Sequence, residues 1–279
     1  MKALYDVPAP AKLNLFLHVV GRRADGMHLL QSAFMLIDWC DTLHFERRDD
    51  GAISRDDLSV ALPDDDLIVR AASALQGATG TRCGAHISVD KRVPSQAGMG
   101  GGSSDAASTL LALNRLWALD LPLTALARIG LGLGADVPFF LGGHNGWVEG
   151  VGEAIVPIRI APARFVVLKP REGLETARIF GAQDLRRDTE TATIMGFAED
   201  PFGFGCNDLE PVARRLCPGV TQALDWLKSQ GLHGRMTGSG SAVFARVDDD
   251  PELARIGGAF EARLCRNQDH HPLLGWARK

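Results

Sequence analysis

The sequence is marked first by what it lacks, and each absence argues against a class of protein. None of its apolar runs approaches the roughly 18 residues of a membrane-spanning helix. The N-terminal stretch MKALYDVPAPAKLNL has neither the apolar core nor the cleavage site of a signal peptide. The five cysteines are widely spaced and form no C-x-x-C pair, which predicts reduced, mostly buried thiols in a cytoplasmic protein. Because the formal net charge is −4, nucleic acid is not the expected main partner.

Familiar site motifs are missing as well. The glycine-rich stretch does not end in Gly-Lys-Ser/Thr, so it is no P-loop, and Gly98, Gly100 and Ser103 miss the G-x-G-x-x-G spacing. The eight histidines show no H-E-x-x-H spacing, and we expect His270 and His271 to be a surface pair rather than metal ligands. With these motifs excluded, the remaining candidate function is phosphate chemistry, either metal-free or assisted by magnesium.

What is present indicates an ordinary globular protein with an α+β fold. A chain of 279 residues with 46% hydrophobic and 23% charged residues can bury a real core. The hydrophobic pattern restarts near Pro157, so we expect one domain over 1–157 and a second over 158–279. We expect a monomer or weak homodimer that binds small molecules and binds neither nucleic acid nor a membrane.

Apolar periodicity predicts strands and helices in both halves. The expected strands are residues 11–20, 32–37, 42–47, 85–89 and 164–168, with a glycine turn and strand over 233–247. Apart from the helix after the glycine stretch, the expected helices follow the acidic residues 64–66 or cover 123–131, 175–187, 208–230 and 251–265.

The stretch 91–105, KRVPSQAGMGGGSSD, is the strongest local signal. Its glycines free the backbone so that N–H groups can converge on one point. We expect Ser103, Ser104 and Asp105 to cap a helix whose apolar stripe is buried. A flexible turn is the alternative, but a glycine loop before a helix N-terminus favours a phosphate. The stretch 238–241, Gly-Ser-Gly-Ser, is a candidate for a second anion-binding nest.

Two further places carry chemistry but leave alternatives open. In the strand 11–20, Leu13, Leu15, Leu17 and Val19 share the face expected to be buried, so Lys12 and Asn14 point to the other face. That face is either solvated or aimed into a cleft. Asp136, between glycines and Pro138, is either a poised base or a turn cap.

Three separated segments resemble the three motifs of the GHMP small-molecule kinases: PAPAKLNLFLHVVGRRADGMH, KRVPSQAGMGGGSSDAAS and MTGSGSAVFA. AKLNLFL, the R-x-D-G-x-H turn, GGGSSDAA, GADVPFF and EGVGE further resemble the branch that phosphorylates an alcohol linked to cytidine diphosphate. The resemblance runs over nearly the whole chain, is specific in the first 155 residues and is thinner over 158–232.

The resemblance implies a two-domain fold with the active site in the interdomain cleft. The N-terminal domain would resemble domain 2 of ribosomal protein S5, and the C-terminal domain would be a ferredoxin-like α/β sandwich. The implied reaction moves the γ-phosphoryl group of ATP, with Mg²⁺, to the 2-hydroxyl of CDP-methylerythritol, a step of the non-mevalonate route to isoprenoid precursors. Asp136 matches the catalytic base and Lys12 its partner; a positioned base contributes about 10²–10⁴-fold.

The resemblance also implies the remaining site residues. Those expected to hold ATP are Asp66, Leu67, Lys91, Pro94, Ser95, Gln96, Ala97, Gly98, Met99, Gly100, Gly101, Gly102, Ser103 and Ser104. Those expected to hold the substrate are Asn14, Met27, His28, Thr176, Phe180, Gly238 and Ser239. Ser104 is also the expected neighbour of Mg²⁺.

Three departures from the family pattern stand out. Met27 replaces a frequent tyrosine that stacks on the base, so we expect weaker stacking. Asp66 replaces an asparagine near the adenine, and an anion only accepts hydrogen bonds. Residues 95–97 replace a more glycine-rich run, which predicts a stiffer start of the loop.

Two alternatives to this function stay open at the level of sequence. One is another GHMP kinase, acting on homoserine or mevalonate, which Met27 favours slightly and GADVPFF disfavours. The other is a non-catalytic nucleotide binder, which would be expected to lack Lys12 or Asp136, whereas both are present.

Overall fold

The structure is a computed structural model that describes residues 1–249, 251 and 258–278. Ten strands of this part of the chain form one sheet in the order β3-β4-β2-β10-β7-β9-β8, with β1 and β5 on β2 and β6 on β5. The strands are β1 (Ala3–Arg22), β2 (His28–Arg48), β3 (Ile53–Asp57), β4 (Gly84–Asp90), β5 (Gly146–Gly150), β6 (Ala154–Pro157), β7 (Arg164–Pro170), β8 (Arg235–Met236), β9 (Val243–Val247) and β10 (Phe260–Gln268).

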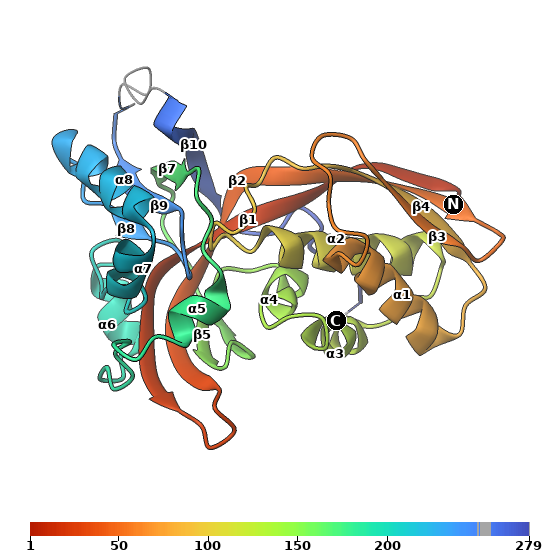
Figure 1. The fold of residues 1–279 in the computed structure, drawn as a ribbon. Coiled ribbons are helices and arrows are strands. Elements are labelled where there is room, and N and C mark those ends of the chain that lie inside the picture. The colour runs from red at the N-terminus through yellow and green to blue at the C-terminus, as the bar shows by residue number, and fades with distance from the viewer. Residues whose placement is uncertain (250, 252–257, 279) are drawn as a thin grey trace.

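Helices gather in two groups, one at each end of the long β1–β2 hairpin (Figure 1). The first group is α1 (Leu67–Thr79), α2 (Gly101–Leu116), α3 (Leu123–Leu131) and α4 (Val137–Gly142). The second is α5 (Thr176–Phe180), α6 (Ile194–Glu199), α7 (Glu210–Leu216) and α8 (Pro218–Ser229). The described helices include none long and apolar enough to cross a membrane.

The β1–β2 hairpin departs from the regular alternation that the sequence predicted. Register shifts interrupt β1 between Pro10 and Lys12 and again between Asn14 and Leu17. A bulge adds a residue to one strand and turns the following side chains to the other face. Leu17 therefore packs in a different core from Leu13, and the expectation of one shared face is wrong.

The strands predicted over 32–37 and 42–47 are one continuous strand, β2. Its first part pairs with β5, and its second part pairs with β4 from Thr42 onward. β2 stays extended through 38–41, where the sequence pattern gives no strand signal, because Cys40 and Asp41 pair with Pro10 and Ala9 of β1. This strand carries the sheet from one helix group to the other.

Three apolar clusters form the core, and each of them contains residues from both sides of residue 157. The cluster over α1–α4 includes Leu273 from the C-terminal segment. The cluster under α7 and α8 includes Leu17 and Val19 from β1. The division into 1–157 and 158–279 stays a prediction, and this packing shows that each half lends residues to the other's core.

Several predicted helices have the expected bounds and others do not. α3 covers 123–131 as expected, and α1 begins after Asp66, whose carboxylate accepts from the N–H of Val69. The helix expected over 208–230 is broken between α7 and α8, because Pro218 has no N–H to continue α7. The helix expected over 175–187 is confined to α5.

The helix predicted over 251–265 is wrong from Phe260 onward. Residues 260–268 form β10, which pairs with β7 along its length and with β2 near its end. Both partners are distant in sequence, so local periodicity carried no signal of this pairing. Residues 252–257 lie outside the described part of the chain.

The cysteine and histidine expectations need correction. All five cysteines are free, but only Cys217 and Cys265 are buried, so the expectation of mostly buried thiols is wrong. His270 is exposed as expected, whereas His271 is buried and burial lowers its pKa to about 4. The two neighbours are therefore not a surface pair.

Candidate active site

One cavity, about 1190 Å³ in volume, brings together nearly all the residues that the sequence singled out. Its walls come from β1 and β2, from the loop that leads into α2, from the segment before α4 and from α5. The predicted residues on its wall are Lys12, Asn14, Met27, His28, Asp66, Leu67, Lys91, every residue from Pro94 to Ser103, Asp136, Thr176, Phe180, Gly238 and Ser239.

A lysine–aspartate pair lies in this cavity. Lys12 Nζ is 3.6 Å from Asp136 Oδ2, and the side chains are 4% and 29% exposed. The ammonium also donates to Asn14 Oδ1 at 2.5 Å and lies 4.6 Å from the ring centre of Phe34. Burial lowers the pKa of Lys12, and the charge of Asp136 opposes that shift. The carboxylate thus reaches the cavity while the lysine lies buried beside it.

The contacts of these two segments exclude one of the two alternatives that the sequence left open for each. Asp136 is the N-cap residue of α4, but its side chain makes no capping hydrogen bond, so the turn-cap interpretation is wrong. Asn14 Nδ2 donates to Ser32 Oγ at 2.9 Å while its Oδ1 accepts from Lys12. Both side chains of the strand are therefore buried together at the cavity rather than solvated.

The glycine loop presents a helix N-terminus to the cavity. α2 begins at Gly101, with Gly100 as N-cap at a φ of 71° that favours glycine. A Cβ at Gly101 would lie 3.1 Å from the Val93 side chain, so the glycine lets the helix start close to the loop that follows β4. The first N–H groups of a helix have no intrahelical acceptor and carry partial positive charge. Gly100 to Ser103 line the cavity, so this helix start offers N–H groups and partial positive charge to the cavity.

The serines were expected at the cap, and the structure corrects this. Ser103, Ser104 and Asp105 lie inside the first turns of α2, because the glycines take the cap and first helical positions. Ser103 lines the cavity, whereas Ser104 is fully buried and is absent from the lining. Ser104 Oγ has no hydrogen-bond partner among the described residues. The hydroxyl that faces the cavity is that of Ser103.

The second glycine turn supports the first. A Cβ on Gly98 would lie 2.1 Å from the carbonyl oxygen of Thr237, so the two loops touch backbone to backbone. The N–H of Ser241 donates to Gln96 O at 3.1 Å and that of Ala242 to Ala97 O at 3.2 Å. The N–H of Ser241 is thus bonded to the first loop, while Gly238, Ser239 and Gly240 line the cavity, so the anion nest at 238–241 stays a prediction.

A buried ionic cluster fixes the start of the glycine loop. Lys91 Nζ donates to Asp41 and lies 2.6 Å from Asp105 Oδ2. Asp41 Oδ1 also accepts from the N–H groups of Arg92 and Val93, at 2.6 and 2.7 Å. Lys91 was expected to hold ATP, but its ammonium is engaged by the side chains of Asp41 and Asp105, which join β2, the loop and α2.

Asp66 has two partners within the protein. Its Oδ1 lies 2.6 Å from Arg55 Nη1 and accepts from Val69 N at 3.1 Å. A carboxylate at this cap position stabilises the helix by about 1 kcal/mol. Its place on the cavity wall beside Leu67 is as expected, but its carboxylate is largely occupied by α1 and Arg55.

The far end of the cavity is built from side chains. The rings of His28 and Phe180 lie 5.0 Å apart at 37°, and Arg187 Nε donates to His28 Nε2 at 3.0 Å. Thr176 and Ser239 share a hydrogen bond of 2.7 Å between their hydroxyls. Met27 is 51% exposed beside this group. Burial lowers the pKa of His28, and the neighbouring arginines lower it further.

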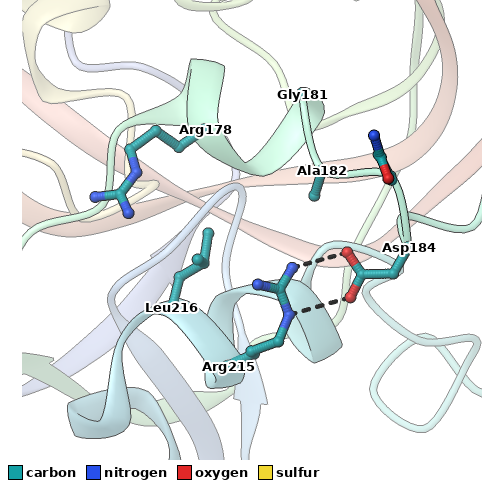
Figure 2. Close-up of a pocket in the computed structure, with 7 residues that line it drawn as sticks. Arg178, Gly181, Ala182, Asp184, Arg215 and Leu216 are labelled. Carbon is teal, nitrogen blue, oxygen red and sulfur yellow. Dashed lines mark hydrogen bonds and ion pairs between the residues drawn. The ribbon is translucent and has the colours of Figure 1, made fainter.

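A second, shallower hollow lies against the other side of the α5 segment. Figure 2 shows Ala182 and Leu216 between Arg178 on one side and the bidentate Arg215–Asp184 ion pair on the other. Gly181 lines both this hollow and the main cavity. No predicted site residue lines the hollow, so the chemistry of the chain gathers in the main cavity.

Sequence reasoning missed residues that act across the chain. Thr237 Oγ1 accepts from the N–H of Asn14 at 2.9 Å and so joins β1 to the second glycine turn. Asp41 and Arg187 likewise bond partners more than 50 residues away. Thr237 was inside a recognised motif, but Asp41 and Arg187 lie in no sequence motif, so the local sequence did not single them out.

Comparison with known proteins identifies the family of the chain. The family models for the GHMP kinases N terminal domain and GHMP kinases C terminal match residues 66–144 and 190–266. The chain is 65% identical over 277 residues, 99% of its length and 96% of the relative's, to the 4-diphosphocytidyl-2-C-methyl-D-erythritol kinase of Albidiferax ferrireducens.

Solved structures give the same result. A crystal structure of 4-(cytidine 5'-diphospho)-2C-methyl-D-erythritol kinase matches with a TM-score of 0.81 and 32% identity, covering 95% of this chain and 98% of that one. Homoserine kinase from Cytophaga hutchinsonii matches with a TM-score of 0.70 and 15% identity, covering 97% and 96%, which shows the shared fold alone. The chain therefore belongs to the GHMP kinase family, on the branch formed by the 4-diphosphocytidyl-2-C-methyl-D-erythritol kinases.

Proposed function

We propose that this chain transfers the γ-phosphoryl group of ATP to the 2-hydroxyl of CDP-methylerythritol, in the non-mevalonate route to isoprenoid precursors. The observation that carries the proposal is the Lys12–Asp136 pair in one cavity with a helix N-terminus, in a chain 65% identical to a kinase of that name. A non-catalytic binder would need neither the pair nor its burial.

Asp136 acts as the general base in this proposal. A tertiary alcohol is a weak nucleophile at neutral pH, so a carboxylate must accept its proton as the oxygen–phosphorus bond forms. The oxygen–phosphorus bond to ADP breaks in the same displacement, and ADP leaves. Lys12, 3.6 Å from Asp136, stabilises the negative charge that develops on the alcohol oxygen.

The start of α2 holds the phosphates of ATP in this proposal. Gly100 to Ser103 offer backbone N–H groups and the positive end of a helix to a triphosphate. Within residues 1–249, 251 and 258–278, no group of three or more His, Cys, Asp or Glu side chains could hold a metal ion. In this proposal magnesium enters with ATP, with the Ser103 hydroxyl beside it, since Mg²⁺ commonly binds through substrate phosphates.

The cytidine end of the substrate occupies the side-chain wall formed by Met27, His28, Thr176, Phe180 and Ser239. The support is the spacing of the His28 and Phe180 rings and the hydrogen-bonding groups that surround them. Flat rings beside polar groups suit a nucleobase, which offers both a π-face and hydrogen-bonding edges. A cytoplasmic location and a monomer or weak homodimer stay predictions from the sequence.

A coupled ADP-release assay with Mg–ATP tests the proposal. CDP-methylerythritol, homoserine and mevalonate are compared at equal concentrations, and ATP binding is measured separately. Turnover of CDP-methylerythritol alone is the expected result. Turnover of homoserine or mevalonate would move the substrate to another GHMP class, and ATP binding without turnover of any alcohol would favour the non-catalytic binder.

A further inference from the structure

Arg187 connects both walls at the side-chain end of the cavity. Its Nε donates to His28 Nε2 at 3.0 Å, which ties it to the start of β2. Its Nη1 donates to Leu185 O at 2.9 Å, and its Nη2 donates to Phe180 O and Ala182 O at 3.2 and 2.7 Å. One guanidinium therefore holds the histidine and the turn that follows α5 in fixed relation.

These bonds determine where the proton of His28 lies. A guanidinium has only donors and stays protonated at every physiological pH. His28 Nε2 must therefore accept, and the single proton of the neutral ring is on Nδ1. Among the described residues none bonds Nδ1, while His28 lines the cavity. The ring thus keeps one N–H donor for a ligand.

The surrounding charges favour the same neutral form. Arg187 and Arg22, the residue paired with His28 across the β1–β2 hairpin, both act against an imidazolium. Burial is the largest cause of the lowered pKa, followed by Arg187 and then Arg22. Protonating His28 would also remove the acceptor of the Arg187 bond and place two cations in contact.

We propose that Arg187 is a positioning residue for the cytidine-linked alcohol. It fixes His28 as the neutral Nδ1–H tautomer and holds the Phe180 backbone beside it. This inference rests on the proposed function for the identity of the ligand, but the tautomer itself is a property of the free protein. Arg187 touches no reacting atom, so it acts on alcohol binding and not on the phosphoryl step.

Two-bond ¹H–¹⁵N spectra of ¹⁵N-histidine protein at pH 7 test the tautomer without any substrate. The His28 signals are assigned by their loss in His28→Gln. We expect a protonated Nδ1 and an unprotonated Nε2 in the wild type. In Arg187→Met the Nε2–H tautomer should appear, and the ring should titrate closer to the ordinary pKa of about 6.5. A wild-type ring that is an imidazolium or carries its proton on Nε2 overturns the inference, even if the variant does not fold.

Steady-state kinetics test the consequence for the substrate. Arg187→Met should raise the KM for CDP-methylerythritol by about tenfold or more. The variant loses the hydrogen bonds by which the guanidinium holds His28 and the Phe180 backbone in position for the alcohol. The KM for ATP should stay within about twofold. From pH 7.5 to 5.5 the alcohol KM should stay flat in the wild type and rise in the variant as His28 becomes protonated.

Arg186→Met is the matched control, since Arg186 is exposed and pairs only with Asp188 in the described contacts. It should leave the tautomer and both KM values unchanged. An unchanged alcohol KM in Arg187→Met despite a changed tautomer would refute the positioning role. Wild-type turnover of homoserine instead of the cytidine-linked alcohol would refute the proposed function while leaving the tautomer result intact.

Discussion

The two ends of the cavity are built from different chemistry. At the glycine end, the cavity wall is largely backbone, packed against Thr237 and fixed by the buried Asp41–Lys91–Asp105 cluster. At the opposite end, the wall is made of side chains such as His28 and Phe180, held by the bonds of Arg187. A triphosphate is the same in every ATP, so a rigid backbone suits it, whereas a particular alcohol must be selected by side chains.

The comparison also separates binding from chemistry. Lys12 and Asp136 line the cavity as a pair: Lys12, on β1, lies against Phe34 of β2, and Asp136 directly precedes α4. Changes at one end should therefore move the KM of one substrate, while changes at the centre should move kcat. The predictions below test that separation, from the largest expected effect to the smallest.

Asp136→Asn should lower kcat by about 10²–10⁴-fold, because the amide cannot accept the alcohol proton. The KM for ATP should change little, since the helix start of α2 is untouched. Asp225→Asn, an exposed carboxylate on α8, is the control for a lost charge. Full turnover by the Asp136 variant in the ADP-release assay would show that the base is misassigned.

Gly98→Ala should raise the KM for ATP by about tenfold to a hundredfold, because overpacking costs about 1–3 kcal/mol. The added Cβ would lie 2.1 Å from Thr237 O, at a φ of 73° that disfavours alanine. Gly77→Ala, at a helical position on α1 with nothing within 4 Å, should instead stabilise the fold by about 0.5–1 kcal/mol. Unchanged ATP kinetics in Gly98→Ala would contradict backbone packing between the loops.

Asp105→Asn should change how stability depends on pH. Burial raises the pKa of Asp105 to about 8; Lys91 opposes the shift and Asp41 adds to it. The folded state then holds a proton that the unfolded state releases above about pH 4, so wild-type stability falls as pH rises from about 4 to 8.

The amide has no proton to release, so that loss should vanish in Asp105→Asn. Urea unfolding at pH 5 and pH 8 measures the free energy of unfolding of both proteins. From pH 5 to pH 8 the free energy of unfolding of the variant should rise relative to that of the wild type by about 1.4 kcal/mol or more, which corresponds to one pKa unit. Parallel pH dependence in the two proteins would mean that Asp105 is ionised in the folded state.

Met27→Tyr should have the smallest effect, lowering the KM for CDP-methylerythritol by about two- to tenfold. An aromatic pair contributes about 0.5–1.5 kcal/mol beyond its buried area, and Met27 is 51% exposed on the cavity wall. The measurement is the ratio of alcohol KM values at fixed Mg–ATP. A KM that stays constant or rises would contradict the idea that Met27 weakens stacking on the cytosine.

The same difference between the ends explains what the sequence could predict. The glycine loop, Lys12, Asn14 and Asp136 were found because each lies in a short pattern whose residue types already limit the chemistry. Their contacts confirm the cleft-facing strand and exclude the turn cap. The predicted N-cap of α2 was wrong by a few residues, because the glycines themselves start the helix.

Long-range contacts were beyond local reasoning. Arg187 bonds His28 across 159 positions and Thr237 bonds Asn14 across 223, so no local pattern shows that these residues pair. β10 was predicted as helix for the same reason, since β7 supplies its hydrogen bonds from far away in the chain. Residues that act through distant backbone are visible only once the sheet brings them together.

The central claim is that one end of the cavity holds ATP while the other reads the cytidine-linked alcohol. The most direct test compares kcat/KM for CDP-methylerythritol with that for methylerythritol 4-phosphate, which lacks the cytidine, at saturating Mg–ATP. The account predicts a preference of about 10³-fold or more for the cytidine-linked alcohol, as sites built to bond specific groups reject substrates that lack them. Equal turnover of the two alcohols would contradict it.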